Sequence, residues 1–388
     1  MTVTSITVTS MTVTSMTVNI GIICGGRSGE HEVSLQSALG IYHALDRSRF
    51  NPLLLAIGPD GIWYAGTAEA LIEHPADPAR IRLRQNAEAV LLRNDGDEGV
   101  VVRQDTNDEV ARVSVVFPIV HGTDGEDGAL QGMLRILGLP TVGSGVLGSA
   151  IGMDKPVMKR LLKDAGLPTA RWTVIREPEN GAARFAELEQ VWGLPLFVKP
   201  AALGSSVGIS RVAQQAEFAP ALEEAFRYDR RVIVEEAIAG REIECSVLGN
   251  PVPSRWPPRA SVPGEIVPKP GGFYSYAAKY LDPEGAALVA PAELDAETMG
   301  RVQELALAVF DTLEAEGMAR VDLFLRADGG LVVNEINTLP GFTPISMYPR
   351  LWELSGLSYS ELLSRLVDLA LERYDQVKGL QRWFDLPG

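Results

Sequence analysis

The chain has 388 residues, of which 46% are hydrophobic and 22% charged, and its formal net charge is -15. This length exceeds what one hydrophobic core usually serves, so we expect about two or three domains. The acidic balance argues against a broad nucleic-acid surface, because phosphate binding needs clustered Lys and Arg. Two distant cysteines, Cys24 and Cys245, fit a reducing compartment. The sequence contains no run of about 18 apolar residues, so it predicts no membrane span.

The first residues of the chain form a repetitive segment. Residues 1–16 repeat the sequence Thr-Val-Thr-Ser. They lack the basic start and the apolar centre of a signal peptide. We therefore interpret residues 1–17 as a disordered tail, with Met16 as an alternative translation start.

Short apolar strands alternate with helical spacing in the next part. Residues 18–26 predict a buried strand that ends in glycines, and residues 34–45 have the apolar spacing of a helix. Two more apolar runs of strand length cover 51–58 and 113–120, and the polar stretch before the second one predicts a surface hairpin. This alternation indicates a doubly wound α/β domain with a parallel sheet over residues 18–143.

The middle of the chain predicts a small α+β domain over residues 144–236. One helix begins near Pro156, which suits a first helical turn, and ends at Gly166. Strand-like runs and a further helix follow it, with strands at 171–175, 195–200, 207–212 and 231–238 and the helix at 213–227.

Residues 237–378 predict a third domain, followed by a short tail over 379–388. We expect strands at 241–249, 319–326 and 330–337, and helices at 296–315 and 358–377. The stretch 262–285 is rich in Pro, Gly and Tyr. We interpret it as a long mobile loop, a type of segment that is usually functional in a compact domain.

A predicted hairpin in the third domain gives the strongest local sign of a metal site. Asp328-Gly329 between two alternating apolar runs is typical of a two-residue turn. This turn sets the pairing of the two strands, with Asp322 opposite Glu335 and Arg320 opposite Asn337. Two opposed carboxylates repel each other, and a hard cation such as Mg²⁺ relieves the repulsion while bridging to substrate phosphates. The alternatives are a solvated outer face and a register shifted by one residue.

The stretch 198–212 supplies candidate phosphate ligands. Gly204 and Gly208 permit tight curvature, so that backbone N–H groups can approach an anion closely. Two hydroxyl groups come from the residues between them, Ser205 and Ser206. A Gly/Ser loop alone is usually a plain turn, but Lys199 at the end of an apolar strand favours phosphate binding.

Three further residues lie where ligands are often bound. Lys155 stands at a helix start, where the helix dipole favours an anion, although a solvated lysine is the alternative. Glu30 follows the first strand and would attract an ammonium group. His121 ends a strand beside glycines and is a candidate substrate contact, with a capping or core histidine as the alternative. Neither a P-loop nor the dinucleotide-binding glycine spacing is present.

Seven motifs occur in order along the chain: GGRSGEHEVSL, HGTDGEDGALQGML, MDKPVMKRLL, VKPAALGSSVGISRV, FYSYAAKYL, ARVDLFL and NEINTLPGFTPIS. Together they resemble the D-alanine–D-alanine ligase family of the ATP-grasp superfamily, over about residues 18–378. The resemblance implies a three-domain ATP-grasp fold that binds ATP between its second and third domains. It implies that two D-alanines are joined through an acyl phosphate, with release of ADP and phosphate, for peptidoglycan precursors. It also implies a cytoplasmic homodimer without nucleic-acid or membrane partners.

The resemblance also implies roles for individual residues. Two Mg²⁺ ions, for which Mn²⁺ can substitute, would be held by Asp322, Glu335 and Asn337. ATP would contact Lys155, Lys199, Ser205, Ser206, Glu235, Glu236, Glu242, Lys279, Asn334 and Glu335. D-Alanine would contact Glu30, His121, Arg320, Gly341, Ser346 and Met347. The catalytic set would be Glu30, Ser205, Tyr280, Arg320 and Ser346, with Glu30, Ser205 and Tyr280 in a hydrogen-bonded trio that closes the site.

Two alternatives to this activity stay open at the level of sequence. The same fold could use another acceptor, such as D-lactate, D-serine or a different amine. A non-catalytic nucleotide-binding module is the second alternative. The complete metal set, the two lysines and Arg320 favour an enzyme over such a module.

Overall fold

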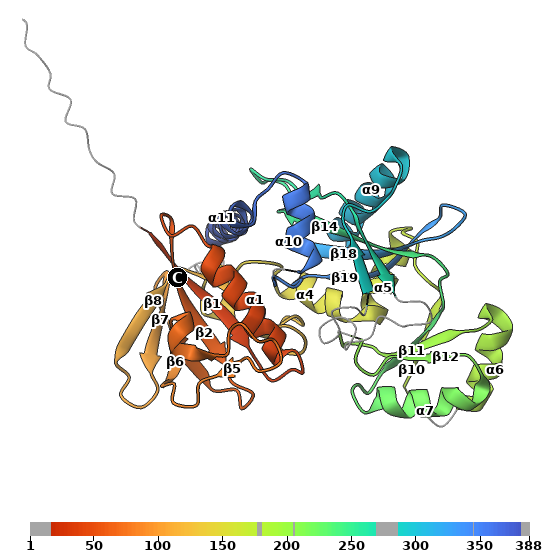
Figure 1. Ribbon diagram of the computed structural model, residues 1–388, viewed down its shortest axis with the longest axis horizontal. Helices are drawn as coiled ribbons and strands as arrows, with labels where there is room; N and C mark the ends of the chain where they lie inside the picture. The colour runs from red at the N-terminus through yellow and green to blue at the C-terminus, as the bar shows by residue number, and fades with distance from the viewer. Residues whose placement is uncertain (1–16, 177–180, 205, 269–285, 344, 382–388) are drawn as a thin grey trace, which may run out of the picture.

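The computed structural model describes residues 17–176, 181–204, 206–268, 286–343 and 345–381. Nearly all of the predicted tail over 1–17, most of the predicted loop, Ser205, Lys279 and Tyr280 lie outside these residues. Figure 1 shows the strands gathered in three regions along the long axis of the molecule. The strands of the N-terminal region lie at one end, β10, β11 and β12 at the other, and β14, β18 and β19 between them.

The first sheet contains both parallel and antiparallel strands. Its order is β8-β7-β6-β3-β2-β1-β9, with bounds β1 Val18–Gly25, β2 Phe50–Ile57, β3 Trp63–Gly66, β6 Ala89–Asp95, β7 Glu98–Arg103, β8 Glu109–Val113 and β9 Val115–Pro118. Only β2, β1 and β9 pair in parallel. The predicted α/β class with a parallel sheet in this region is thus confirmed, and antiparallel strands, among them the predicted surface hairpin, extend that sheet on one side. Short turns join β2 to β3 and β6 through β8, and such turns connect antiparallel neighbours.

The end of β1 requires glycine. Gly25 has a φ of +83°, and a Cβ atom at this position would lie 2.2 Å from the carbonyl oxygen of Ile57. The N–H of Gly25 donates a hydrogen bond of 2.7 Å to Oγ of Ser34 in helix α1 (His31–Ala44). This contact packs α1 tightly against the strand end and places Glu30 at the N-cap position of the helix.

The second sheet is small and antiparallel. Its order is β10-β13-β11-β12, with bounds β10 Trp172–Ile175, β11 Leu196–Pro200, β12 Ser210–Val212 and β13 Val232–Glu236. Helices α6 (Gly181–Trp192) and α7 (Gln215–Phe226) pack on it around a core that contains Phe185 and Phe218. The chain enters this region through α4 (Val146–Met153) and α5 (Lys155–Asp164). Helices α4 and α6 were not predicted, whereas the four strands, α5 and α7 were.

The third sheet carries the predicted hairpin. Its order is β17-β16-β14-β18-β19, and β15 also pairs with β14. The bounds are β14 Arg241–Gly249, β15 Arg259–Ala260, β16 Gly264–Pro268, β17 Ala286–Val289, β18 Gly317–Leu325 and β19 Leu331–Asn337, with helix α9 at Ala296–Thr312. Strand β16 lies inside the stretch 262–285 that we interpreted as a loop. That interpretation was wrong for its first part, because backbone pairing with β14 outweighs the Pro- and Gly-rich composition.

The hairpin between β18 and β19 has the predicted pairs but not the predicted turn. Leu325 pairs with Leu331, and Arg326 N–H donates to the carbonyl oxygen of Gly330 at 2.9 Å, so the turn contains three residues rather than two. A bulge at Asn334 then shifts the register by one residue. The two deviations cancel, and they confirm the predicted pairs Asp322 with Glu335 and Arg320 with Asn337.

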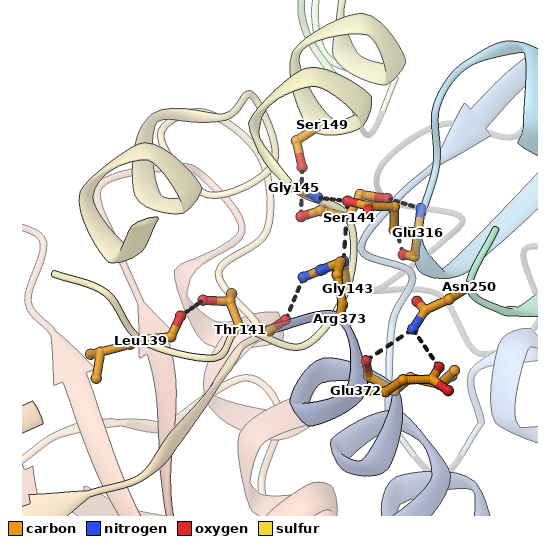
Figure 2. Close-up of polar contacts among 11 residues, drawn as sticks. Leu139, Thr141, Gly143, Ser144, Gly145, Ser149, Asn250, Glu316, Glu372 and Arg373 are labelled. Atoms are coloured by element: carbon orange, nitrogen blue, oxygen red, sulfur yellow. Dashed lines mark hydrogen bonds and ion pairs between the residues drawn. The ribbon is translucent and has the colours of Figure 1, made fainter. Parts of the chain in front are cut away.

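The last helix, α11 (Tyr359–Lys378), joins the N-terminal region to the third sheet. It contacts α1 and β9 on one side and β14 and β18 on the other. Figure 2 shows its Arg373 beside the segment that follows the first sheet. The Arg373 guanidinium donates to the carbonyl oxygens of Thr141 and Gly143, each at 2.6 Å, and lies 3.2 Å from Glu316.

Smaller elements complete the described chain. They are α2 (Ala68–Leu71), α3 (Ala129–Ile136) and α10 (Met347–Leu354), and the strands β4 (Ile72–Glu73) and β5 (Arg82–Leu83). None of the helices in the described ranges has both the length and the apolar character that crossing a membrane requires.

Candidate active site

Two adjoining cavities contain almost all of the described residues that we predicted for the site. The first, called here the lysine cavity, has a volume of about 180 Å³ and lies between the second and third sheets. The second, called here the strand-end cavity, has a volume of about 130 Å³ and lies between the first and third sheets. Gly204 and Glu335 line both cavities. A larger depression of about 1040 Å³ beside α1 and α10 contains none of the predicted residues.

The lysine cavity combines apolar walls with lysines and carboxylates. The predicted residues that line it are Lys155, Lys199, Ser206, Glu235, Glu236, Glu242, Asn334 and Glu335. Apolar side chains complete the lining, among them Phe197, Ile209, Ile238, Phe324 and Val333. Such a cavity suits a nucleotide, because its apolar walls can contact a flat base and its lysines can contact charged phosphates.

Lys155 is held at the start of α5 by contacts to the Gly/Ser loop. Asp154 caps the helix by accepting a hydrogen bond from the N–H of Val157 at 3.1 Å. The Lys155 ammonium donates to the carbonyl oxygen of Leu203 at 2.9 Å and lies 3.3 Å from Glu335. The side chain is buried, so the alternative of a solvated lysine was wrong.

Glu235 sits between two lysines. Its Oε2 lies 2.6 Å from the ammonium of Lys199, and its Oε1 lies 2.8 Å from the ammonium of Lys159. Burial alone would raise the pKa of Glu235, but the two lysines lower it to about 2. Burial would lower the pKa of Lys199, yet Glu235 raises it above its usual value. For Lys159 burial has the largest effect and, together with the nearby ammonium groups of Lys199 and Lys155, lowers the pKa although Glu235 acts to raise it.

Glu236 and the Gly/Ser loop border the lysine cavity. Glu236 accepts hydrogen bonds of 2.7 Å from both the backbone N–H and the Nε of Arg171. In the loop, Ser206 and Gly208 have positive φ angles of 59° and 68°. A Cβ atom on Gly208 would lie 2.7 Å from the ring of Tyr228, so the loop depends on glycine there.

The predicted metal ligands are neighbours on one face of the third sheet. Asp322 accepts two hydrogen bonds of 2.7 Å from Arg320 and one of 3.0 Å from the amide of Asn337. Glu335 is opposite Asp322, and Glu244 of β14 pairs with Asp322 on its other side. Arg320 also lies 3.3 Å from Glu244. The cationic side chains of Arg320 and Lys155 thus offset part of the repulsion that we expected Mg²⁺ to relieve.

The donor set of these residues fits Mg²⁺. Within the described ranges no group of three or more His, Cys, Asp and Glu side chains is arranged to hold a metal ion. Asp322 and Glu335 nevertheless offer two carboxylates, and Asn337 offers an amide oxygen. Mg²⁺ is usually bound through one or two carboxylates together with substrate phosphates, so a larger protein cage is not required.

The strand-end cavity contains every described residue predicted to contact the amino-acid substrate. These residues are Glu30, His121, Arg320, Gly341, Ser346 and Met347. Two segments of the N-terminal region meet closely at this cavity, because a Cβ atom on Gly122 would lie 2.9 Å from Oε2 of Glu30. The lining combines carboxylates from Glu30, Glu126 and Glu244 with the cation of Arg320. Such a mixture suits a ligand that carries both an ammonium and a carboxylate group.

His121 is buried at the wall of this cavity. Its Nδ1 lies 3.2 Å from Oε1 of Glu126, and its Nε2 lies 3.2 Å from Oγ of Ser37. Burial would lower the pKa of His121, but Glu126 and Glu30 together raise it above its ordinary value. The side chain is therefore both a core histidine and a cavity residue, so the two interpretations from sequence do not exclude each other.

Ser346 is fixed at the first turn of α10. Its Oγ accepts a hydrogen bond of 3.0 Å from the N–H of Thr343 and lies 2.8 Å from the Thr343 hydroxyl. A Cβ atom on Gly341 would lie 2.8 Å from the same Oγ, so glycine allows the chain to fold back over the helix start. The next residue, Met347, is buried and anchors α10 to the sheet.

Sequence reasoning missed Glu126 and Glu244, which line the strand-end cavity, and Lys159, which lies beside the lysine cavity against Glu235. Lys159 lies four residues after Lys155 and hence on the same helix face, and Glu244 lies two residues after Glu242 on one strand. These spacings could have indicated both. The contact between Glu126 and His121 depends on the loop conformation, which the sequence pattern does not give.

Comparisons with known proteins agree over most of the chain. Residues 19–144 match the family model described as D-ala D-ala ligase N-terminus, and residues 161–368 match the model described as D-ala D-ala ligase C-terminus. The D-alanine–D-alanine ligase of Oceanobacillus iheyensis is 49% identical over 93% of this chain and 97% of its own. The structure of the D-alanine-D-alanine ligase from Coxiella burnetii superposes with a TM-score of 0.78 and 36% identity, covering 93% of this chain and 96% of that one. The VanG D-Ala:D-Ser ligase from Enterococcus faecalis has the same TM-score with 34% identity, covering 92% and 100%.

Proposed function

The chain belongs to the D-alanine–D-alanine ligase family, and we propose that it joins two D-alanines into D-alanyl-D-alanine at the expense of ATP. The observation that carries this proposal is the pair of adjoining cavities that share Gly204 and Glu335. One cavity has the lysines and apolar walls that suit ATP, and the other has the mixed charges that suit an amino acid. A γ-phosphate at their junction would meet the carboxylate of the amino acid.

The lysine cavity supports binding of ATP. The ammonium groups of Lys155 and Lys199 lie at its wall and would attract phosphate oxygens. Phe197 and Ile209 offer apolar surface to the base. Glu242 is placed in the same cavity and would accept hydrogen bonds from ribose hydroxyl groups.

We assign the binding of Mg²⁺, with Mn²⁺ as a substitute, to Asp322, Glu335 and Asn337. When bound there, such ions would neutralise charge on the transferred phosphoryl group. Asp322 and Glu335 are brought together by the pairing of β18 and β19, and this pairing supports the assignment. The number of ions, two by resemblance, belongs to the same proposal.

The strand-end cavity supports binding of both D-alanines. Glu30 would hold the ammonium group of the first D-alanine, and His121, whose pKa is raised by Glu126 and Glu30 against the effect of burial, would face its carboxylate. Arg320 lines the strand-end cavity and would stabilise negative charge on the reacting carboxyl group. Ser346 and Met347 would border the second D-alanine.

The reaction proceeds in two steps in this proposal. The carboxylate oxygen of the first D-alanine attacks the γ-phosphorus, so that an acyl phosphate forms and ADP leaves. The amine of the second D-alanine then attacks the acyl carbon, and the tetrahedral intermediate expels phosphate. The protein contributes position and charge rather than a covalent intermediate, through Lys155, Lys199 and Arg320.

A second acceptor remains a candidate on one specific observation. The VanG D-Ala:D-Ser ligase has a structure that covers 92% of this chain, so the fold alone does not determine the acceptor. We propose D-alanine because the family models and the relative that is 49% identical carry D-alanine in their names.

The proposed function is tested by D-alanine-dependent release of ADP. The full chain is incubated with ATP and either D-alanine alone or D-alanine with D-serine or D-lactate, with and without Mg²⁺. We expect turnover with D-alanine alone, loss of turnover without a divalent ion, and D-alanyl-D-alanine as the main product by mass spectrometry. Turnover that requires D-serine or D-lactate would select the other acceptor, and no D-alanine-dependent ADP would contradict the ligase.

Three further expectations stay proposals. We propose domains over residues 18–143, 144–236 and 237–378, a homodimer, and a cytoplasmic location. Light scattering on the purified chain measures the mass in solution, which we expect to be twice the 41.9 kDa of one chain.

A further inference from the structure

Among the described lysines near the lysine cavity, Lys159 is the most deeply buried, and the sequence motifs assign it no role. It lies one helical turn after Lys155 on α5, and only 1% of its side chain is exposed. Its ammonium lies 2.8 Å from Oε1 of Glu235. Since a buried ammonium is costly unless it is paired, this contact is a specific feature of the fold.

Glu235 connects Lys159 to the wall of the lysine cavity. Its other oxygen, Oε2, lies 2.6 Å from the ammonium of Lys199, and only 4% of the Glu235 side chain is exposed. Glu235 and Lys199 line the cavity, and Lys159 is not among the lining residues. Lys159 therefore lies behind the carboxylate and can act on a nucleotide only through Glu235.

Lys159, Glu235 and Lys199 form a row of alternating charges, and this row affects how strongly Lys199 can bind a phosphate. The carboxylate of Glu235 attracts the Lys199 ammonium and so competes with any phosphate that enters the cavity. Lys159 occupies the second oxygen of that carboxylate and neutralises part of its charge. Without Lys159, the whole negative charge of Glu235 would be directed at Lys199.

We propose that Lys159 is a positioning residue for nucleotide binding, which orients Glu235 and keeps the Lys199 ammonium available to phosphate. This inference rests on the proposed function of the lysine cavity as the ATP site. It assigns Glu235 the role of a shared counter-ion between two lysines, in addition to any contact with the nucleoside. Lys159 has no role in D-alanine binding in this arrangement.

The test compares Lys159→Met with a matched control on the same helix, Lys163→Met, whose lysine is exposed. A non-hydrolysable ATP analogue with Mg²⁺ is titrated calorimetrically into the full chain, and KM values for ATP and D-alanine are measured. We expect Lys159→Met to weaken analogue binding and raise the KM for ATP by about tenfold or more, with the KM for D-alanine within about twofold. Lys163→Met should change none of these values. Equal ATP affinity in Lys159→Met and the wild type would overturn the proposal, as would equal losses for both substrates.

A second comparison keeps the proposal testable if Lys159→Met does not fold. Because Lys159 acts only through Glu235, the double variant Lys159→Met/Glu235→Gln should bind the analogue as Glu235→Gln does alone. It should also bind at least about threefold more tightly than Lys159→Met where that variant folds. A further loss of more than about threefold in the double variant would overturn the proposal. A wild-type chain that binds the analogue but does not ligate D-alanine would contradict only the proposed function.

Discussion

Charged side chains at and beside the two cavities form ion pairs. These pairs determine how much charge each side chain can offer to a bound substrate. Lys155 is paired with Glu335, and Arg320 is paired with Asp322. Each cation would exchange part of its contact with the protein for contact with a phosphate or carboxylate during binding. Such exchange keeps the buried charges compensated before and after a ligand enters.

Replacing Asp322 by asparagine tests the metal assignment at a single residue. The substitution keeps the size of the side chain but removes one of the two carboxylates on the hairpin. We expect the kcat of D-alanine-dependent ADP release to fall by more than about 100-fold, since even indirect partners of metal ligands commonly contribute about 10–100-fold. The control is Asp328→Asn on the exposed turn of the same hairpin, which should retain its activity. An Asp322→Asn chain with more than a tenth of the wild-type kcat would contradict the assignment.

The pair of His121 and Glu126 predicts a pH-dependent contribution to stability. The pKa of buried His121 is raised because Glu126 and Glu30 outweigh the effect of burial. A raised folded-state pKa means that protonation favours folding, so the contribution is complete below about pH 6.5 and is lost as the pH rises through the folded-state pKa.

We therefore expect Glu126→Gln to lower the free energy of unfolding by about 1.5–3 kcal/mol near pH 6 and by much less near pH 9. Denaturant unfolding of both chains at several pH values measures the difference. A difference that grows with rising pH would be the wrong sign and would refute the explanation.

At the scale of elements, sequence patterns gave most strands and helices of the site but not their irregularities. The pairing of Asp322 with Glu335 was predicted from a two-residue turn, while the structure has a three-residue turn and a bulge at Asn334. A periodic pattern indicates which face a residue occupies, but a bulge depends on contacts with neighbouring strands. The strand β16 was missed for a related reason, since its pairing with β14 is not encoded in its own composition.

Candidate site residues were predictable where a motif or a spacing marked them. Lys155 and Lys199 stand at element ends beside glycines or a helix start, and both line the lysine cavity. Lys159 looks like an ordinary helix residue in sequence, and only the burial of its ammonium against Glu235 distinguishes it. Tertiary contacts of this kind cannot be read from one sequence without the fold.

The Gly/Ser loop makes a prediction at the scale of an element. Gly208 has a φ of +68°, and a Cβ atom there would lie 2.7 Å from Tyr228 and 2.9 Å from Pro200. We expect Gly208→Ala to lower the free energy of unfolding by about 1–3 kcal/mol and to raise the KM for ATP, because the loop that covers the cavity must shift. Gly300 lies within α9, and a Cβ atom added there would meet no other atom within 4 Å. Gly300→Ala should therefore stabilise the chain by about 0.5–1 kcal/mol. Unchanged stability in Gly208→Ala would show that the loop does not need glycine.

At the scale of the whole molecule, α11 connects the first and third sheets. One hydrophobic core contains Ile20 and Phe117 of the first sheet, Met318 of the third, and Leu366 of α11. Arg373 adds hydrogen bonds to the segment that follows the first sheet (Figure 2). Because the strand-end cavity lies between these sheets, this connection keeps Glu30 and Arg320 on opposite walls of one site.

Removing the Arg373 guanidinium should loosen this connection. Arg373→Met leaves the carbonyl groups of Thr141 and Gly143 without this donor and removes the cation beside Glu316, which keeps its hydrogen bond from the Gly145 N–H. We therefore expect a loss of about 3–5 kcal/mol in the free energy of unfolding. Denaturant unfolding followed by tryptophan fluorescence measures the loss. The exposed Arg135→Met, from the same region, should stay within about 0.5 kcal/mol of the wild type. A loss below about 1 kcal/mol in Arg373→Met would show that α11 is held by apolar packing alone.

A nucleotide and an amino acid are proposed to meet where the two cavities share Glu335 and Gly204. A crystal structure of the chain with a non-hydrolysable ATP analogue, Mg²⁺ and D-alanine would show both ligands in place. We expect the γ-phosphate between Lys155 and the Asp322–Glu335 pair, with Mg²⁺ on those carboxylates and the D-alanine ammonium at Glu30. A nucleotide bound outside the lysine cavity, or D-alanine bound away from Glu30, would contradict it.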